Sequence, residues 1–287
     1  MTVIKEDYSE KVQYDDPDYP VYIRRSFLST YPHYAAPSHW HEDIELIAVL
    51  SGQMKYSVNG EIIDLKEGEG IFVNSRQMHF GFSDTNAECE FLCIIFHPML
   101  LCMTTAYERD FVLPVIRHTG LPFLHLCPEN GWQKEIWQQI RSVYLCREKP
   151  AARMRMGAAF LTIWSLIYEN MSLHEKQQQK QDTDLVTVKN MIGFIQQNYT
   201  GRVSLAEIAA SGMLGQSKCC KLFTKYLGET PNMYLTRYRL NKSMILLKNT
   251  DKTVTEIAIE TGFGSGSYYA ETFRKWIGKS PREFRAG

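Results

Sequence analysis

Thr253–Phe284 has the sequence TVTEIAIETGFGSGSYYAETFRKWIGKSPREF, and the chain contains the pattern of this stretch twice. The earlier copy, Ser204–Tyr234, has the sequence SLAEIAASGMLGQSKCCKLFTKYLGETPNMY. Each copy opens with Ser/Thr-x-x-Glu, which predicts a reciprocally capped helix N-terminus. Gly212 and Gly262 then predict a sharp turn after that helix. The sequence therefore predicts two similar helical units in tandem.

A second helix is predicted after the turn in each copy. Apolar side chains at positions i, i+3, i+4 and i+7 define its expected inner face. These positions hold Cys219, Leu222, Phe223 and Tyr226 in the first copy, and Tyr269, Thr272, Phe273 and Trp276 in the second. A Thr or Ser followed by Pro then predicts a further helix, which we expect from Pro231 to Leu247 in the first copy. This order of elements is typical of a helix-turn-helix unit.

The charge distribution favours a nucleic-acid partner for this half of the chain. Net charge is zero over 287 residues, but residues 183–287 carry 15 Lys and Arg against 8 Asp and Glu, a net +7. A basic domain attracts phosphate, although charge imbalance also occurs on solvated surfaces. The alternative is a generic helical bundle. The duplicated turn combined with the positive charge favours DNA binding.

The second copy also carries a family resemblance. IAIETGFGSGSYYAETFRKWIGKSPREFR, Ile257–Arg285, resembles the C-terminal signature of AraC-type transcription regulators, with Ile-Ala, Gly-Phe, Phe-Arg-Lys, Gly-x-Ser-Pro and Phe-Arg in order. The resemblance extends from Leu185 to Arg285. It implies a single chain that places two recognition helices in adjacent major-groove segments of double-stranded DNA, joined by a long helix.

Each second helix offers polar residues on the face opposite its apolar stripe. Residues near the helix N-terminus on that face are expected to contact bases, and later basic residues to hold phosphates. The expected base contacts are Gln216, Ser217, Lys218 and Lys221 in the first copy, and Ser267, Tyr268 and Glu271 in the second. The expected phosphate contacts are Lys225, Arg274 and Lys275. For Glu271, a solvated surface position is the alternative. We interpret Cys219 of the Cys219-Cys220 pair as a core residue and not as a redox switch.

The N-terminal half has the pattern of a small barrel or sandwich. Short apolar stretches between Val21 and Cys102 are separated by turn residues at Gly52, Asn59-Gly60 and Gly68–Gly70, as in compact antiparallel folds. Asn59-Gly60 between alternating apolar residues predicts a tight hairpin. The expected fold class is therefore multidomain α+β, with a cupin-like barrel plus helices and an all-α C-terminal domain of two helix-turn-helix units.

Helical periodicity replaces the strand pattern beyond Gly131. Two helices rich in large apolar residues are expected between Gly131 and Leu173, broken at Pro150. They either cover the barrel or pair with a second copy of the chain in a homodimer. The expected domains are an effector-sensing barrel at 1–128, a helical and dimerising segment at 129–173, a linker at 174–184 and the DNA-binding domain at 185–287.

HWHEDIE, His39–Glu45, is the stretch that most suggests chemistry. If it forms one strand, His39, His41 and Glu45 share a face, because strand side chains alternate. In an AraC-type regulator the resemblance implies a cupin barrel that senses an effector. HWHEDIELIAVLSG fits the first cupin motif, and the second is partly matched by the stretch that ends at His79. In that second stretch Arg76 and Met78 stand where the motif has Pro and Gly.

Three interpretations of this cluster stay open. In cupin enzymes such residues bind a metal with open coordination positions, and the candidate metal ligands are His39, His41, Glu45 and His79. In related sensors similar residues line a metal-free pocket for a sugar or other small molecule, which we favour. The candidate effector-binding residues are Arg24, His39, Trp40, His41, Glu45 and His79, with Tyr22 nearby. The third interpretation is that the histidines are structural.

The whole-chain hypothesis is a regulator and not an enzyme. A cupin metalloenzyme leaves the basic duplicated C-terminus unexplained, so we expect a cytoplasmic, dimeric DNA-binding protein that responds to a carbohydrate and requires no cofactor. A divalent metal in the barrel is the alternative. Localisation is predicted from the absence of a secretory signal at the N-terminus and of any apolar stretch of about 18 residues. The seven cysteines include no Cys-x-x-Cys pair, which agrees with a reducing compartment.

Overall fold

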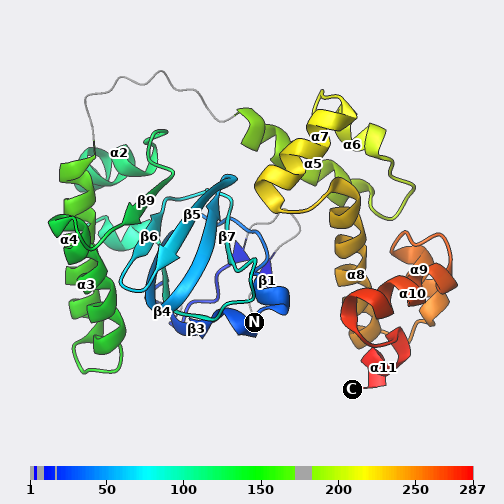
Figure 1. Ribbon diagram of the computed structural model, residues 1–287, viewed down its shortest axis with the longest axis horizontal. Helices are drawn as coiled ribbons and strands as arrows, with labels where there is room; N and C mark the ends of the chain where they lie inside the picture. Colours follow the sequence, from blue (N-terminus) through cyan, green and yellow to red (C-terminus); the bar gives the residue numbers. More distant parts are fainter. Residues whose placement is uncertain (1–2, 5–9, 17, 172–182, 287) are drawn as a thin grey trace. The chain divides into compact units, whose positions relative to one another are not determined.

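The computed structural model describes residues 3–4, 10–16, 18–171 and 183–286 (Figure 1). The chain divides into two compact units, Met1–Gln181 and Asp182–Gly287. The linker expected at 174–184 lies outside the described residues except for its last two positions. These two begin the helix Thr183–Asn198.

The first unit is built around antiparallel strands. They are β1 (Val3–Ile4), β2 (Glu10–Lys11), β3 (Val21–Phe27), β4 (Ile44–Val58), β5 (Glu61–Lys66), β6 (Gly70–Val73), β7 (His79–Phe82), β8 (Cys89–Phe96) and β9 (Phe123–Leu126). The main sheet has the order β3-β8-β4-β6-β9, with β5 and β7 also paired to β4. β4 is thus the strand on which the barrel is assembled.

β4 changes neighbours along its length because it bends. Its first half pairs with β6 and its second half with β5 and β7, while the register with β8 shifts between Val49 and Ser51. Gly52 follows this bulge with a φ of 77°. A Cβ added there would lie 2.2 Å from the Glu88 carbonyl oxygen, so the bend requires glycine.

The predicted hairpin is confirmed at Asn59 and Gly60. Both residues have positive φ, 51° and 80°, as a two-residue turn between twisted strands requires. The turn joins β4 to β5 in register, pairing Val58 with Glu61.

Two long helices cover one face of the sheet. They are α3 (Gly131–Cys146) and α4 (Ala152–Asn170). Ile140 of α3 and Phe160 of α4 are fully buried in one core with Leu46 of β4. A second core fills the inside of the barrel around Val49 and Leu65. The buried residues of both helices therefore pack on the barrel, while Leu145 of α3 and Met154 of α4 are exposed.

Short helical turns complete the first unit. They are η1 (Leu28–Thr30), η2 (Pro32–Tyr34), η3 (Pro98–Leu101), α1 (Thr105–Tyr107), η4 (Glu108–Val112) and α2 (Leu113–Ile116). No helix in the described parts of the chain has the length and apolar content needed to cross a bilayer.

The second unit is entirely helical. Its helices are α5 (Thr183–Asn198), α6 (Leu205–Ser211), α7 (Gln216–Leu227), α8 (Pro231–Asn249), α9 (Val254–Glu260), α10 (Gly266–Ile277) and α11 (Pro281–Ala286). Both predicted capping boxes are present, between Ser204 and Glu207 and between Thr253 and Glu256. The long helix α8 ends two residues later than predicted.

The predicted inner faces are correct except at one position. Cys219, Leu222, Phe223 and Tyr226 of α7 are buried, as are Tyr269, Thr272 and Phe273 of α10. Trp276 is 38% exposed, so its assignment to the inner face was wrong. The six-residue α11 packs Phe284 against Phe273.

The capping boxes give a stability prediction. Ser204→Ala removes the hydroxyl that accepts from the Glu207 amide, and we expect the unfolding free energy of the second unit to fall by about 1 kcal/mol. Calorimetry of the full-length protein measures this loss. Ser217→Ala, at an exposed position of α7, is the matched control, and an equal effect of both changes would contradict the capping role.

Candidate functional site

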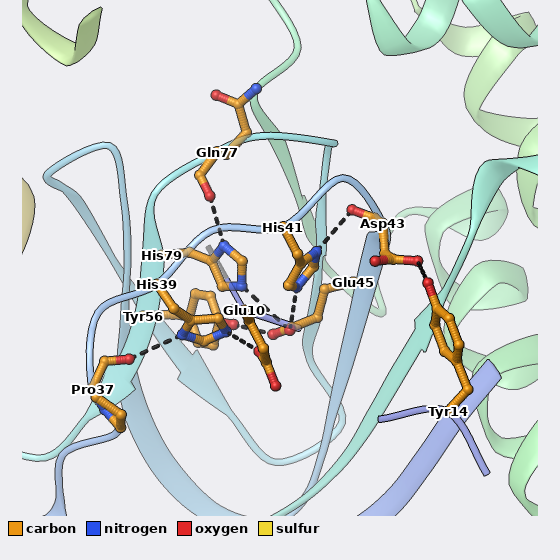
Figure 2. A network of polar contacts seen from close by, with 10 residues as sticks. All are labelled: Glu10, Tyr14, Pro37, His39, His41, Asp43, Glu45, Tyr56, Gln77 and His79. Carbon is orange, nitrogen blue, oxygen red and sulfur yellow. Dashed lines mark hydrogen bonds and ion pairs between the residues drawn. The ribbon is translucent and has the colours of Figure 1, made fainter. Parts of the chain in front are cut away.

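His39, His41, Glu45 and His79 come together at one end of the barrel (Figure 2). His39 and His79 face each other in an antiparallel bridge with backbone N···O distances of 3.1 and 2.8 Å. One ligand atom from each of the four side chains lies within 4.8 Å of the others. The four residues indicated by HWHEDIE and by the resemblance to cupin motifs therefore lie close together.

The expected single strand through HWHEDIE was wrong. The chain bends at Glu42 and Asp43, and β4 begins only at Ile44. His41 therefore lies before the bend and Glu45 after it, yet the two side chains still converge, with His41 Nε2 3.3 Å from Glu45 Oε2. The bend, not strand alternation, directs them toward each other.

Backbone carbonyls set the orientation of all three imidazoles. In each ring Nδ1 lies beside a carbonyl oxygen: Pro37 for His39 at 2.9 Å, Asp43 for His41 at 3.0 Å, and Gln77 for His79 at 2.9 Å. A carbonyl oxygen only accepts hydrogen bonds, so each Nδ1 carries the proton. Each Nε2 is then directed into the cluster (Figure 2).

Glu45 is the buried charge at the centre. Its side chain is only 4% exposed, accepts a hydrogen bond from the Tyr56 hydroxyl, and lies 3.3 Å from Nε2 of His79. Burial alone would raise the pKa of Glu45, but the charges and hydrogen bonds of His79 and His41 lower it well below its ordinary value. For His79, burial is the main cause of a lowered pKa.

A segment near the N-terminus supplies a second acid that no sequence motif indicated. Glu10 Oε2 lies 3.1 Å from His39 Nε2, and this contact raises the pKa of His39 although burial opposes it. Two hydrogen bonds hold the same segment in place: the Glu10 amide donates to the Trp40 carbonyl, and the Tyr14 hydroxyl donates to the Asp43 carboxylate. Glu10 thereby becomes part of the cluster.

The cluster borders a small cavity inside the barrel. Its volume is about 50 Å³, and its wall is mostly apolar and aromatic. The lining includes Glu10, Tyr22, Tyr31, His39, Glu45, Met54, Tyr56, Phe91 and Cys93. Tyr31, Tyr56 and Cys93 are wall residues that the sequence reasoning missed.

Of the candidate effector residues, His39 and Glu45 line this cavity, whereas Arg24, Trp40, His41 and His79 do not. Arg24 is exposed, lies over the Tyr22 ring at 4.4 Å and pairs with Asp15 at 2.6 Å. Trp40 is half-buried beside the cluster. The structure thus brings the histidines, Glu45 and Tyr22 together, with Arg24 and Trp40 outside.

The expected DNA-contacting residues lie on the exposed faces of α7 and α10. All ten are exposed: Gln216, Ser217, Lys218, Lys221 and Lys225 on α7, and Ser267, Tyr268, Glu271, Arg274 and Lys275 on α10. Lys218 pairs with Asp184 of α5 at 3.2 Å, and Lys225 lies over the ring of Tyr226. The buried stripe of each helix faces the opposite way.

Comparison with known proteins agrees with both units. A helix-turn-helix domain model matches residues 208–287, and a cupin domain model matches residues 27–95. An uncharacterized HTH-type transcriptional regulator, YdeC of Bacillus subtilis strain 168, is 25% identical over 99% of this chain and 97% of its own length. The melibiose operon regulatory protein of Escherichia coli K12 is 26% identical over 93% of this chain and 89% of its own length.

A solved structure gives a partial match. A transcriptional regulator of the AraC-type DNA-binding class from Chromobacterium violaceum is 30% identical, covers 35% of this chain and 90% of its own, and has a TM-score of 0.34. A cupin barrel followed by tandem helix-turn-helix units defines a DNA-binding transcription regulator and not an enzyme. The chain belongs to the AraC family of these regulators, with an N-terminal cupin domain.

The buried carboxylate gives a prediction at the cluster. Tyr56→Phe removes the hydrogen bond to Glu45 and leaves a buried acceptor poorly satisfied, so we expect the barrel to lose about 1–3 kcal/mol of stability. Chemical denaturation of the full-length protein measures the loss. Tyr107→Phe removes the same atom from a ring that is partly exposed; if it destabilises the barrel equally, the Tyr56 contact carries no special weight.

Proposed function

We propose that this AraC-type regulator contacts DNA through the exposed faces of α7 and α10 and that its barrel binds a small-molecule effector. The exposure of all ten candidate contact residues supports the first part. On α7, Lys221 lies where it can contact base edges, and Lys225, one turn later, where it can hold a phosphate. The four-residue cluster beside a cavity carries the second part.

A carbohydrate is the effector class that we propose first. It is supported by the similarity over 93% of this chain to a protein named as the melibiose operon regulator and by the aromatic cavity wall, which also includes Glu10, Glu45 and His39. A volume of about 50 Å³ is far below the roughly 300 Å³ of small ligand pockets. Sugar binding therefore requires the cavity to widen, and we propose that this change alters DNA binding in a homodimer.

A divalent metal is the second candidate, favoured by the fixed imidazoles. Three Nε2 atoms with protons held on Nδ1, together with Glu45, form a donor set that suits a transition metal. The residues present therefore fit a metal, which would supply a positive charge beside Glu45. In this version the regulator senses the ion itself.

Thermal unfolding of the full-length protein distinguishes the two effectors. The protein is heated with monosaccharides, disaccharides and glycosides, and separately with divalent metals, each with and without a chelator. At a hundred times the Kd, a specific ligand stabilises by about 2.7 kcal/mol. We expect one sugar class to stabilise the barrel regardless of chelator. Stabilisation by metal alone, lost in His41→Ala, would replace the sugar by the metal, and no stabilisation by either would contradict effector binding in this cavity.

The two lysines of α7 give a prediction about DNA. Lys221→Ala should lower preference at one or two base positions, while Lys225→Ala should weaken all sequences about equally and reduce the salt dependence by about one counterion. Binding to a randomised DNA library at two salt concentrations measures both effects. The assignment of the two roles fails if the variants give the same profile.

A further inference from the structure

Arg239 lies in the middle of α8 and reaches back to the start of the first helix-turn-helix unit. Its Nε donates to the Tyr199 carbonyl at 2.8 Å, and its Nη2 donates to the Gly201 carbonyl at 2.7 Å. Both acceptors lie between α5 and α6. A planar guanidinium presents two N–H groups in the fixed geometry of this fork, whereas an ammonium group donates from a single nitrogen on a flexible stem. Burial lowers the pKa of Arg239, which agrees with its position inside the domain.

The second helix-turn-helix unit lies against two of the same groups, the Tyr199 carbonyl and the Arg239 guanidinium. Gly262, in the turn between α9 and α10, has a φ of 81°. A Cβ added to it would lie 2.1 Å from the Tyr199 carbonyl oxygen and 2.8 Å from Arg239 Nε. The turn of the second helix-turn-helix unit is thus packed directly against the segment that leads into the first helix-turn-helix unit.

Tyr238 completes this contact. Its ring meets that of Tyr199 edge to face, with the centroids 5.0 Å apart. We call Tyr199, Gly201, Tyr238, Arg239 and Gly262 the interunit joint. It connects α5, α8 and the α9–α10 turn, so both helix-turn-helix units are held at one place on α8.

A second arginine shows by contrast what is special about Arg239. Arg285 of α11 also donates to two carbonyls, Leu247 at 3.2 Å and Lys252 at 2.6 Å. Those carbonyls lie at the end of α8 and before α9. Arg285 therefore connects the second helix-turn-helix unit only to the segment that leads into that same unit. Arg239 instead joins the segment between α5 and α6, which leads into the first helix-turn-helix unit, to the α9–α10 turn of the second helix-turn-helix unit.

We propose that Arg239 is a positioning residue that fixes the angle between α7 and α10 and thereby sets the spacing of the two DNA half-sites that the protein accepts. Without the interunit joint, the two helix-turn-helix units are connected mainly through α8 and can rotate about that helix. Recognition helices in successive major-groove segments must match a repeat of about 34 Å, or 10–10.5 base pairs. The inference rests on the proposed role of α7 and α10 in DNA contact.

The test measures spacing preference and not affinity alone. The preferred bipartite site is selected from a randomised library with the full-length wild-type protein, and one, two or five base pairs are then inserted between its halves. We expect wild type to lose about tenfold in affinity or more per changed spacing, equivalent to about 1.4 kcal/mol. Arg239→Gln and Arg239→Lys should bind the altered sites nearly as well as the selected one.

Arg237→Gln is the matched control. It removes the same charge two residues earlier on α8, but the Arg237 pair with Glu229 is local, at 2.6 Å, so spacing preference should stay at the wild-type level. A folded Arg239 variant with wild-type spacing preference overturns the proposal. If neither Arg239 variant folds, the wild-type series decides: tolerance of a half-turn insertion of five base pairs overturns it, and strict spacing supports it. Failure of wild type to select any site would instead contradict the assignment of α7 and α10.

Discussion

The bend in β4 is the constraint on which the first unit depends. Ile44 and Leu46 face the helices, and Ile47 and Val49 face the barrel interior, but after the bulge the interior face belongs to Met54 and Tyr56. Alternation therefore changes phase within one strand. This change brings the Tyr56 hydroxyl onto Glu45 of the same strand. A straight β4 would place these two side chains on opposite faces, and the cluster would lose the donor that satisfies its carboxylate.

A buried carboxylate is costly unless its surroundings compensate it. Around Glu45 the Tyr56 hydroxyl donates a hydrogen bond from the second half of β4, and Nε2 of His41 and Nε2 of His79 each lie 3.3 Å away, where they compensate the carboxylate when they also carry a proton. Three backbone carbonyls hold the imidazoles in place. The Glu10 contact with His39 adds the N-terminal segment to the same network. The cavity is therefore lined both by the barrel wall and by Glu10 of this segment.

The second unit repeats a sequence without repeating all of its contacts. Both copies have a capped first helix and a buried stripe on the second, but the helix that follows the stripe has 19 residues in the first copy (α8) and six in the second (α11). Tyr226 is consequently buried, while Trp276, at the matching position, is partly exposed. Arg239 and Arg285 show the same divergence, because each binds two carbonyls but only Arg239 connects the two copies. The two helix-turn-helix copies share a sequence pattern, and these unequal contacts join them into one DNA-binding domain.

The tandem helix-turn-helix units and the hairpin at Asn59-Gly60 could be predicted from the residues alone, because capping and turn chemistry are local and leave a direct trace in the order of residues. The four cluster residues were indicated by HWHEDIE together with the resemblance to cupin motifs, since no local spacing connects His79 with Glu45. Only the tertiary structure decided that Tyr56 and Glu10 join the cluster, that Arg24 stays outside the cavity, and that Gly262 packs on Tyr199. Each of these depends on a bulge, a bend or a contact between distant segments. Sequence periodicity does not reveal where a bulge occurs, and one extra residue in a strand exchanges its inner and outer faces.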